Sequence, residues 1–201
     1  MSVHHPQFLR AREIVQSGAI GRLCHVDAAF SFHNDDMDNI RNQPATGGGG
    51  LADIGVYVFG GTRFVTGAEP THIRDAKIVR QNGVDTFAQV AAEFRNFTYS
   101  AMVSIRMFKR QELTFHGEKG LVRLTCPFNP GVHDQAELHL ETADNAVTVE
   151  RFPGVNHYVL QVEAFGRSLR DGTPYACPLE FSKGTQEMID MTLKAAEEGG
   201  N

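Results

Sequence analysis

The 201-residue sequence has no apolar run that approaches the roughly 18 residues needed to cross a bilayer, so it predicts no membrane partner. Its first residues also lack the basic segment and apolar core of a signal peptide. The three cysteines, Cys24, Cys126 and Cys177, are odd in number and far apart. This usage favours reduced thiols and a cytoplasmic location over a disulfide framework.

Clusters of basic residues are missing as well. The chain has 19 basic and 24 acidic side chains and a formal net charge of −5, which argues against a nucleic-acid partner. An apolar content of 41% with 21% charged residues is ordinary for a globular protein. Because no internal repeat, low-complexity tract or linker divides the chain, we predict a single domain over residues 1–201.

Two common signatures of ligand sites are not found. No His-x-x-x-His or Cys-x-x-Cys spacing accompanies the adjacent His4 and His5, so we predict no metal site and favour structural or solvent-facing histidines. The glycine run at 47–50 follows a polar loop, whereas a dinucleotide fingerprint G-x-G-x-x-G follows a strand in a βαβ unit. The sequence therefore predicts no cofactor-binding residues in this chain.

The pattern that is present indicates grouped strands between helices. Helical periodicity, glycine at helix ends and proline at a helix start predict helices over 6–17, 51–65, 157–170 and 182–197. Alternating apolar residues and turn residues predict strands over 23–32, 72–81, 86–95, 98–108, 112–116, 121–125, 136–141 and 147–152. Grouped strands predict an α+β fold, and one apolar face on the 98–108 strand is typical of antiparallel sheets.

The helix that follows the glycine run carries the candidate chemistry. Asp53 and Tyr57 are four residues apart, so both project from one face of that helix. A carboxylate beside a phenol can orient a substrate hydroxyl and assist proton transfer. The alternative is structural: an acid favoured by the helix dipole and a half-buried tyrosine. Glycine at a helix start also aims free backbone N–H groups outward, toward a ligand.

Arg41, in the polar loop before the glycine run, is a further candidate. Its guanidinium can clamp a substrate or a partner carboxylate, and the competing interpretation is a solvated loop arginine. Cys126 precedes a proline at a strand end, and inert packing is the better interpretation of this thiol.

A set of short motifs in a fixed order resembles a known family. The set comprises His5-Pro6-Gln7, Ser17-Gly18-Ala19-Ile20-Gly21, Asn39-Ile40-Arg41, Gly48-Gly49-Gly50, Asp53-Ile54-Gly55-Val56-Tyr57, Gly117-Glu118-Lys119-Gly120, Glu163-Ala164-Phe165 and Leu179-Glu180-x-Ser182. In this order they resemble the C-terminal domain of the Gfo/Idh/MocA family of NAD(P)-dependent oxidoreductases. The branch that they resemble most contains dimeric dihydrodiol dehydrogenase and xylose dehydrogenase. The resemblance covers essentially the whole chain.

The resemblance implies a fold and an assembly. The fold is an open, mostly antiparallel sheet of about six strands with helices on one face, like the C-terminal domain of glyceraldehyde-3-phosphate dehydrogenase. The assembly is a homodimer or a higher even oligomer through the open sheet face. Apolar side chains beyond the need of one helical layer, among them Met107, Phe108, Phe115 and Phe128, agree with that expectation.

The resemblance also implies the residues of a site. Asp53 and Tyr57 match the family's catalytic aspartate and its histidine-or-tyrosine partner, and His5, Arg41, Gly49 and Gly50 are implied as substrate contacts. The family's Rossmann domain and its catalytic lysine have no counterpart in this sequence. Phe181 replaces an acidic residue of the motif that opens the last helix.

The implied parent reaction is hydride transfer between a sugar or diol carbinol carbon and the nicotinamide of NAD or NADP. In it Asp53 would hold the hydroxyl in line, and Tyr57 with the missing lysine would handle its proton. We expect the chain alone to be inactive and to bind neither cofactor tightly. Two alternatives remain open: a stand-alone, non-catalytic binding or assembly module that uses the same sheet, and an unrelated small-molecule-binding α+β domain in which the glycine run is structural.

Overall fold

The computed structural model describes residues 1–143 and 146–199. The helices are α1 (Pro6–Gln16), α2 (Val56–Thr66), α3 (His157–Asp171) and α4 (Leu179–Glu198), with 3-10 turns at Ser2–His4, Ile40–Asn42 and Pro44–Thr46 and a π-helical turn at Leu51–Gly55. The strands are β1 (Leu23–His33), β2 (Pro70–Gln81), β3 (Val84–Phe94), β4 (Thr98–Ser104), β5 (Arg106–Gly117), β6 (Gly120–Leu124), β7 (Glu137–Thr142) and β8 (Ala146–Arg151). In the described ranges no helix is both long and apolar enough to cross a membrane.

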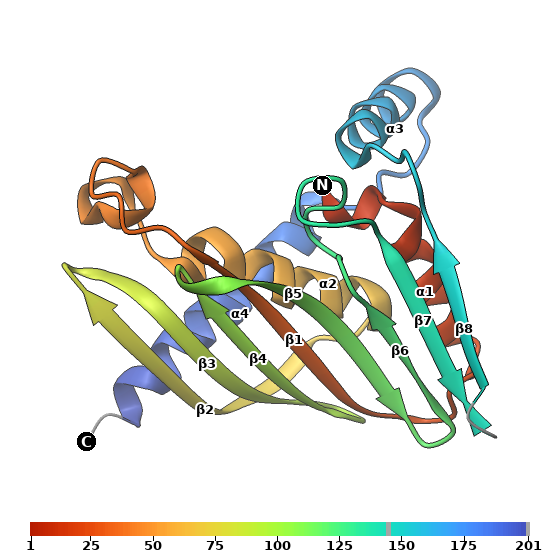
Figure 1. Cartoon of the computed structure of the whole chain (residues 1–201), viewed down its shortest axis with the longest axis horizontal. Coiled ribbons are helices and arrows are strands. Elements are labelled where there is room, and N and C mark those ends of the chain that lie inside the picture. Colours follow the sequence, from red (N-terminus) through yellow and green to blue (C-terminus); the bar gives the residue numbers. More distant parts are fainter. Residues whose placement is uncertain (144–145, 200–201) are drawn as a thin grey trace.

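All eight strands form one sheet in the order β2-β3-β4-β1-β5-β6-β7-β8, so the expected number of about six is too low (Figure 1). Only the β1–β4 pair is parallel, and the other neighbouring pairs are antiparallel. The α+β class and the mostly antiparallel sheet are thus confirmed. The predicted single strand over 98–108 is wrong. Strand β4 ends at Ser104, and after Ile105 the chain continues as β5, which pairs with the other side of β1. Ile105 is fully buried there, and its carbonyl accepts from the N–H of Asn34.

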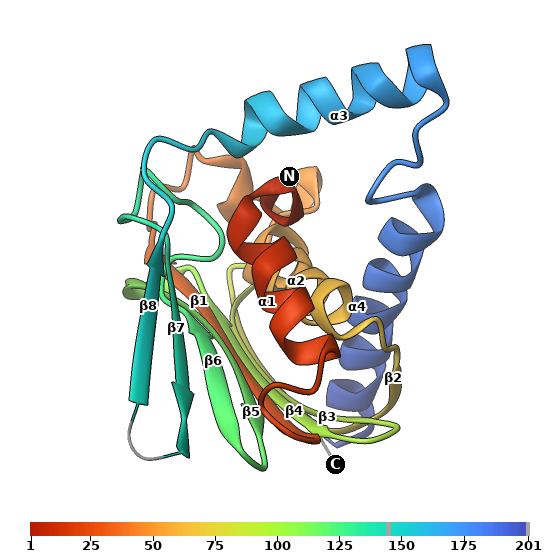
Figure 2. The same cartoon turned by 90° about the vertical axis from the view of Figure 1, so that its right-hand side faces the viewer.

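Helices α1, α2 and α4 cover one face of the sheet, and Figure 2 shows them on the same side of the strands. The core lies in that layer. Its largest fully buried side chains are Tyr99, Phe8, Phe59, Phe115, Phe128, Ile20, Leu51, Ile105, Leu113, Leu124, Leu138 and Met188. Burial of this apolar surface is the main force that holds the helices on the sheet.

The open face of the sheet is polar, not apolar. Phe115 and Phe128 are fully buried, so they do not contribute to it, whereas Met107 is 43% and Phe108 84% exposed. Charged pairs between neighbouring strands occupy much of the sheet surface, among them Arg74 with Glu93, Arg123 with Glu141 and Arg151 with Glu137. Two of the four apolar side chains named for this face, Phe115 and Phe128, therefore belong to the core instead.

The helix starts and ends follow local chemistry. The imidazole of His5 caps α1 in front of Pro6, and Gly67 ends α2 in the left-handed conformation at φ 68°. Helix α4 begins three residues before its expected start, at Leu179. There Phe181 packs edge-on against Phe64, with its ring centroid 4.6 Å from the Arg63 guanidinium carbon. Contacts of Phe181 with Phe64 and Arg63 therefore stabilise the start of α4.

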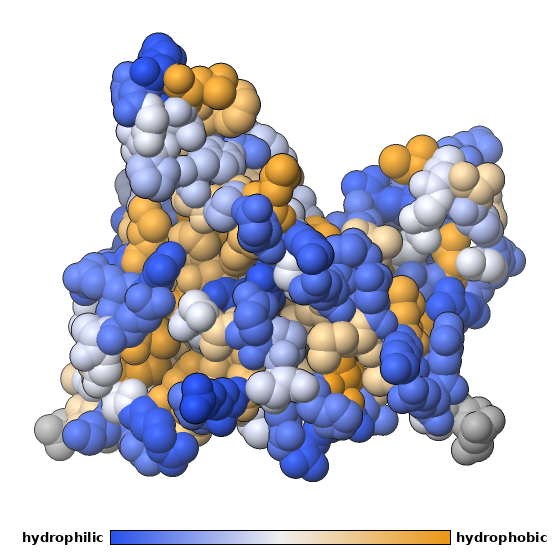
Figure 3. Space-filling view, turned by 180° about the vertical axis from the view of Figure 1, so that it is seen from behind, coloured by the Kyte–Doolittle hydropathy of each residue, from blue (hydrophilic) through white to orange (hydrophobic). Residues whose placement is uncertain are grey.

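Two parts of the chain project from the body. One is the segment 34–48 between β1 and the π-helical turn, and the other is α3. The N-terminus and the start of α2 lie between them (Figure 1). The space-filling view shows both projections and the hollow that separates them (Figure 3). This hollow is the side of the molecule on which the candidate site lies.

Candidate active site

Asp53 lies in the π-helical turn Leu51–Gly55, and Tyr57 lies one turn later, at the start of α2. Their spacing of four residues puts both side chains on one side of the helix. The Asp53 carboxylate and the Arg41 guanidinium are both close enough to Tyr57 to influence the pKa of its phenol. The structure thus brings three of the sequence-predicted residues together at the edge of the hollow.

Arg41 forms an ion pair with Asp53. The Arg41 Nε lies 2.6 Å from Asp53 Oδ2, and the two side chains are 36% and 29% exposed. The Arg41 guanidinium carbon also lies 5.8 Å from the centroid of the Phe32 ring. Its backbone is held by the short 3-10 turn, because the side-chain oxygen of Asn39 accepts from the Arg41 N–H at 3.1 Å. This arrangement orients the carboxylate and leaves its other oxygen available to a ligand.

Tyr57 is half-buried in an aromatic cluster. Its ring packs edge-on against Phe30 at 5.4 Å between centroids and lies 5.7 Å from Phe128. Burial raises the pKa of the Tyr57 phenol, and the nearby Tyr158 and Asp53 raise it further, while Arg41 lowers it. The phenol is therefore neutral near pH 7 and acts as a hydrogen-bond donor, unless another positive charge approaches it.

A buried carboxylate occupies the start of the helix that follows the glycine run. Asp85, at the start of β3, accepts from the Leu51 N–H at 2.6 Å. Gly49 has φ 134°, and a Cβ there would lie 2.1 Å from Asp85 Oδ1. The Leu51 N–H is thus taken by Asp85, and Gly49 is needed for the close approach of this carboxylate.

Asp85 is the residue that the sequence interpretation missed. It follows the Asn82-Gly83 turn, and its role depends on a contact across 34 residues of sequence. Burial raises the pKa of its carboxyl group, and the backbone N–H groups oppose that rise. No local pattern distinguishes such an acid from a solvent-exposed turn residue.

His5 has a structural position. It is fully buried, its Nδ1 accepts from the Gln7 N–H at 3.3 Å, and its ring packs edge-on against Phe152 and His157. Burial and the neighbouring His157 lower the pKa of His5 to about 4, so it is neutral near pH 7. Among the described residues, no hydrogen bond joins it to Arg41, Asp53 or Tyr57, and its contact with substrate stays a prediction from the sequence.

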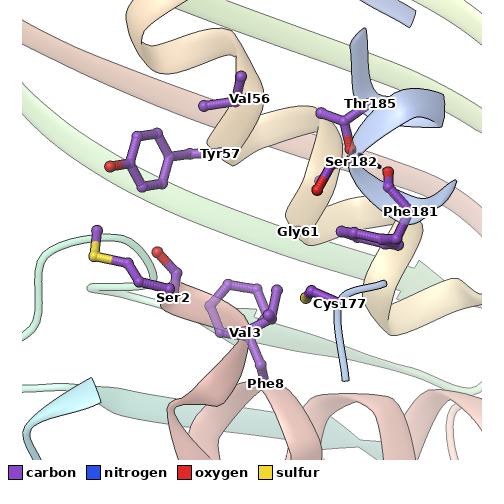
Figure 4. A pocket seen from close by; sticks show the side chains of 12 residues that line it. Ser2, Val3, Phe8, Val56, Tyr57, Gly61, Cys177, Phe181, Ser182 and Thr185 are labelled. Atoms are coloured by element: carbon purple, nitrogen blue, oxygen red, sulfur yellow. Dashed lines mark hydrogen bonds between the residues drawn. The ribbon is translucent and has the colours of Figure 1, made fainter. Parts of the chain in front are cut away.

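A pocket of about 290 Å³ adjoins Tyr57 (Figure 4). It lies between the N-terminal segment, α2 and the start of α4, and its lining is mainly apolar. The lining residues are Met1, Ser2, Val3, Phe8, Val56, Tyr57, Gly60, Gly61, Cys177, Phe181, Ser182 and Thr185. Arg41 and Asp53 lie outside this lining, so Tyr57 connects the pocket with the polar pair.

At the glycine-rich start of the helix that carries Tyr57, the Asp85 carboxylate already accepts from the Leu51 N–H, so this N–H group is not free to bind a pyrophosphate. Among the described residues no group of three potential metal ligands occurs. What the arrangement can do is bind a hydroxyl-bearing ligand between Asp53 and Tyr57.

Comparison with known proteins identifies the family. The family of the GFO/IDH/MocA C-terminal domain matches residues 8–123, more than half of the chain. The chain belongs to the Gfo/Idh/MocA family. The Asp53–Tyr57 helix lies within the matched region, so this region of the Gfo/Idh/MocA domain includes both candidate residues and Arg41.

Two curated Gfo/Idh/MocA relatives match nearly the whole chain. An uncharacterized oxidoreductase of Rhizobium meliloti, ORF334, is 29% identical over 97% of this chain and 60% of its own length. A D-xylose 1-dehydrogenase (NADP(+)) of Haloferax volcanii is 29% identical over the same shares, 97% and 60%. The chain thus spans about 60% of the length of the curated relatives it matches.

Solved structures share the fold. The aldose-aldose oxidoreductase of Caulobacter crescentus, complexed with glycerol, gives a TM-score of 0.88 at 20% identity and covers 98% of this chain and 60% of that one. KijD10, a 3-ketoreductase of Actinomadura kijaniata in complex with NADP and TDP-benzene, gives 0.85 at 22% identity, with 97% and 60% covered. At these identities the likeness is one of fold, and it confirms the architecture of the Gfo/Idh/MocA C-terminal domain.

Proposed function

We propose that this chain is the substrate-binding and oligomerisation part of an NAD- or NADP-dependent oxidoreductase that acts on a CH–OH group of a sugar or diol. The observation that carries the proposal is the Arg41–Asp53 pair beside Tyr57, at the open start of α2. The names of the relatives support it, since one is a xylose dehydrogenase and another a 3-ketoreductase. Single-domain organisation over 1–201 is part of the proposal.

The chemistry assigned to this chain is the handling of a hydroxyl and its proton. Asp53, held by Arg41, accepts a hydrogen bond from the substrate hydroxyl and fixes the direction of its carbon–hydrogen bond. Tyr57, neutral because burial raises its pKa, donates a proton to the oxygen when a carbonyl is reduced to an alcohol. A bound nicotinamide cofactor would supply the redox chemistry.

Activity of the chain alone is not expected under this proposal. In the alcohol-oxidising direction Tyr57 has to accept a proton, which requires the phenolate and hence a lowered pKa. Arg41 is the one group that lowers the pKa of Tyr57, and its guanidinium is already paired with Asp53. A further cation and the dinucleotide site therefore have to come from outside the described residues.

The rival proposal is a non-catalytic assembly module that uses the same sheet. Either function uses the open face of the sheet for a homodimer or a higher even oligomer. The charged pairs on that face make such an interface polar and dependent on salt. Catalysis separates the two proposals, because only the first assigns chemistry to Asp53 and Tyr57.

The test is a fusion in which the part of the Haloferax volcanii relative that precedes its matched region is joined before Met1; the match covers 60% of that relative's length. We expect the fusion to bind NADP and to oxidise a sugar or diol. We expect Asp53→Asn and Tyr57→Phe each to lower kcat by about 100-fold, the lower range for loss of a general acid or base. Asp75→Asn, an exposed aspartate on β2, is the matched control.

Two results would count against the proposal. Equal kcat values for the parent fusion and both site variants would remove Asp53 and Tyr57 from the reaction. A fusion that binds NADP and forms oligomers but turns over no sugar or diol would favour the assembly module.

A further inference from the structure

The segment 34–48, which brings Arg41 to the candidate site, has almost no buried surface of its own. It projects from the body of the molecule (Figure 1), and Asn42, at 1% exposure, is its only buried residue. Segments with so little burial open more readily than the core. The ion pair nevertheless requires Arg41 in one place, because its Nε lies 2.6 Å from Asp53 Oδ2. The polar contacts of Asn42 therefore decide how firmly this segment is held.

The main partner of Asn42 outside the segment is Arg106, the first residue of β5. Its Nη2 donates to Asn42 Oδ1 at 2.7 Å, and its Nη1 donates to the backbone carbonyls of Asn34 and, at 3.1 Å, Ile105. The Asn42 side-chain nitrogen in turn donates to Asn34 Oδ1 at 3.0 Å and to the Asp36 carbonyl at 2.7 Å. One guanidinium thus ties both ends of the loop between Asn34 and Asn42 to the sheet. Hydrogen bonds from a charged donor are stronger than those between neutral groups.

The position of Arg106 is set by the break between β4 and β5. The Arg106 N–H donates to Ser104 Oγ at 3.1 Å, and the Ser104 hydroxyl donates to the Thr86 carbonyl at 2.9 Å. The N–H of the fully buried Ile105 donates to the same carbonyl at 3.1 Å. Arg106 also lies opposite His33 in the register of β5 with β1. The guanidinium is therefore carried by a backbone that three neighbouring strands hold in place.

Asn42 transmits this anchoring to Arg41, because the two residues are neighbours in the 3-10 turn Ile40–Asn42. The side-chain oxygen of Asn39 accepts from the Arg41 N–H at 3.1 Å, and the Arg41 carbonyl accepts from the Gly49 N–H at 3.0 Å. The backbone of Arg41 is thus hydrogen-bonded on both sides, next to a residue that Arg106 fixes. Supporting hydrogen bonds of this kind determine how precisely a site residue is placed.

We infer that Arg106 is a positioning residue for the candidate site: it holds the turn that carries Arg41, and through Arg41 it fixes the direction of the Asp53 carboxylate. This inference rests on the proposed function, which assigns the substrate hydroxyl to Asp53. Among the described residues the Arg106 guanidinium donates to carbonyl oxygens only, so its charge serves the loop. The rival interpretation is an arginine that stabilises only the break between β4 and β5, where it binds the Ile105 carbonyl.

The first experiment uses the intact 201-residue chain and needs no activity. NMR follows hydrogen exchange of the Arg41 Nε–H, assigned by its loss in Arg41→Lys, and of the backbone amides of Gly49 and of residues 26–30 in β1. We expect Arg106→Ala to speed exchange of the Arg41 Nε–H and the Gly49 amide by at least about 10-fold and to leave β1 unchanged. An arginine that serves only the break would speed exchange in β1 and leave the Arg41 Nε–H as it is in the parent.

Two further variants complete this experiment. Arg106→Gln removes the charge but keeps an amide donor, so it replaces Arg106→Ala if that variant does not fold, and it is expected to speed the same two exchange rates. Arg22→Ala is the matched control. It removes a guanidinium that is 64% exposed and pairs with Glu118, just beyond the opposite end of β5, and it should change none of these rates.

The second experiment places the same variants in the fusion with the Haloferax volcanii relative. A misplacement of about 1 Å at a reacting group can lower a rate by about 100-fold. We expect Arg106→Ala to lower kcat by about 10-fold when Asp53 is present and by less than about 2-fold in the Asp53→Asn background, because residues that act through one another are not additive. An arginine that serves only the break would lower kcat by the same factor in both backgrounds. Arg22→Ala should leave kcat unchanged.

The outcomes separate this inference from the proposed function. A fusion that oxidises a sugar or diol and depends on Asp53, but in which Arg106→Ala lowers kcat equally in both backgrounds, overturns the positioning role and leaves the function standing. A fusion without turnover, or one indifferent to Asp53→Asn, counts against the function. The Arg41 Nε–H then decides the inference by itself: faster exchange in the Arg106 variants supports it, and exchange at the parent rate overturns it.

Discussion

Two carboxylates, those of Asp53 and Asp85, lie at the start of the same helix, and the structure predicts that their removal changes the stability of the chain by different amounts. Asp85 is 6% exposed and accepts from the Leu51 N–H at 2.6 Å. Asp53 is 29% exposed on its side chain and pairs with Arg41, which is 36% exposed. If Asp53 is kept for its chemistry and Asp85 for the fold, the loss of Asp85 should destabilise the chain more than the loss of Asp53.

The magnitudes follow from burial. Asp85→Ala leaves buried donors unpaired, which costs about 2 kcal/mol, and for a chain of this length that lowers Tm by about 4–8 °C. Asp53→Asn removes a half-exposed ion pair, which contributes between about 0.2 and 1 kcal/mol, so the expected fall in Tm is at most about 2–4 °C. Tyr57→Phe should also change Tm little, since the ring contacts stay and the hydroxyl has no hydrogen-bond partner among the described residues.

The assay is thermal unfolding of the isolated chain followed by circular dichroism, with the parent, Asp53→Asn, Tyr57→Phe and Asp85→Ala measured side by side. A fall in Tm for Asp53→Asn as large as that for Asp85→Ala would refute the reasoning. It would assign Asp53 to the fold and support the structural interpretation of the Asp53–Tyr57 pair.

Three further predictions concern the chain as it stands. The isolated chain should consume neither NADH nor NADPH, nor reduce the oxidised forms, with any sugar or diol, and consumption above that of a heat-killed control would contradict this. Light scattering at micromolar concentration should give about twice the monomer mass of 22.2 kDa or a higher even multiple, and the interface should bury more than about 1,000 Å². A monomer mass would contradict the dimer proposal. Because burial lowers the pKa of His5 from 6.5 to about 4, the unfolded chain binds more protons between these values, so stability is lost as the pH falls through that window. His5→Asn keeps a capping side chain and should reduce the difference in Tm between about pH 7 and about pH 5, and an unchanged difference would show that other groups carry it.

Local sequence patterns were sufficient for the elements whose causes are local. Proline at the first position of α1, glycine after α2 and the 3.6-residue period predicted those helices to within a few residues. The same period predicted that Asp53 and Tyr57 share a side of one helix. The short motifs in order were sufficient for the family. The helix patterns depend on residues within a few positions of one another, and the family resemblance depends on the order of short motifs along the chain, so the sequence alone determines both.

What the sequence could not determine depends on partners far along the chain. Asp85 reaches the glycine run across 34 residues, and Arg41 reaches Asp53 across a loop that no periodicity describes. The break at Ile105 arises because β4 and β5 flank β1, which is a property of the whole sheet. The sequence predicts a helix at 157–170, but only the structure shows that most of its apolar side chains are exposed. Burial and pairing are set by the tertiary arrangement, and so only the structure decides which polar residues serve the fold and which are open to a ligand.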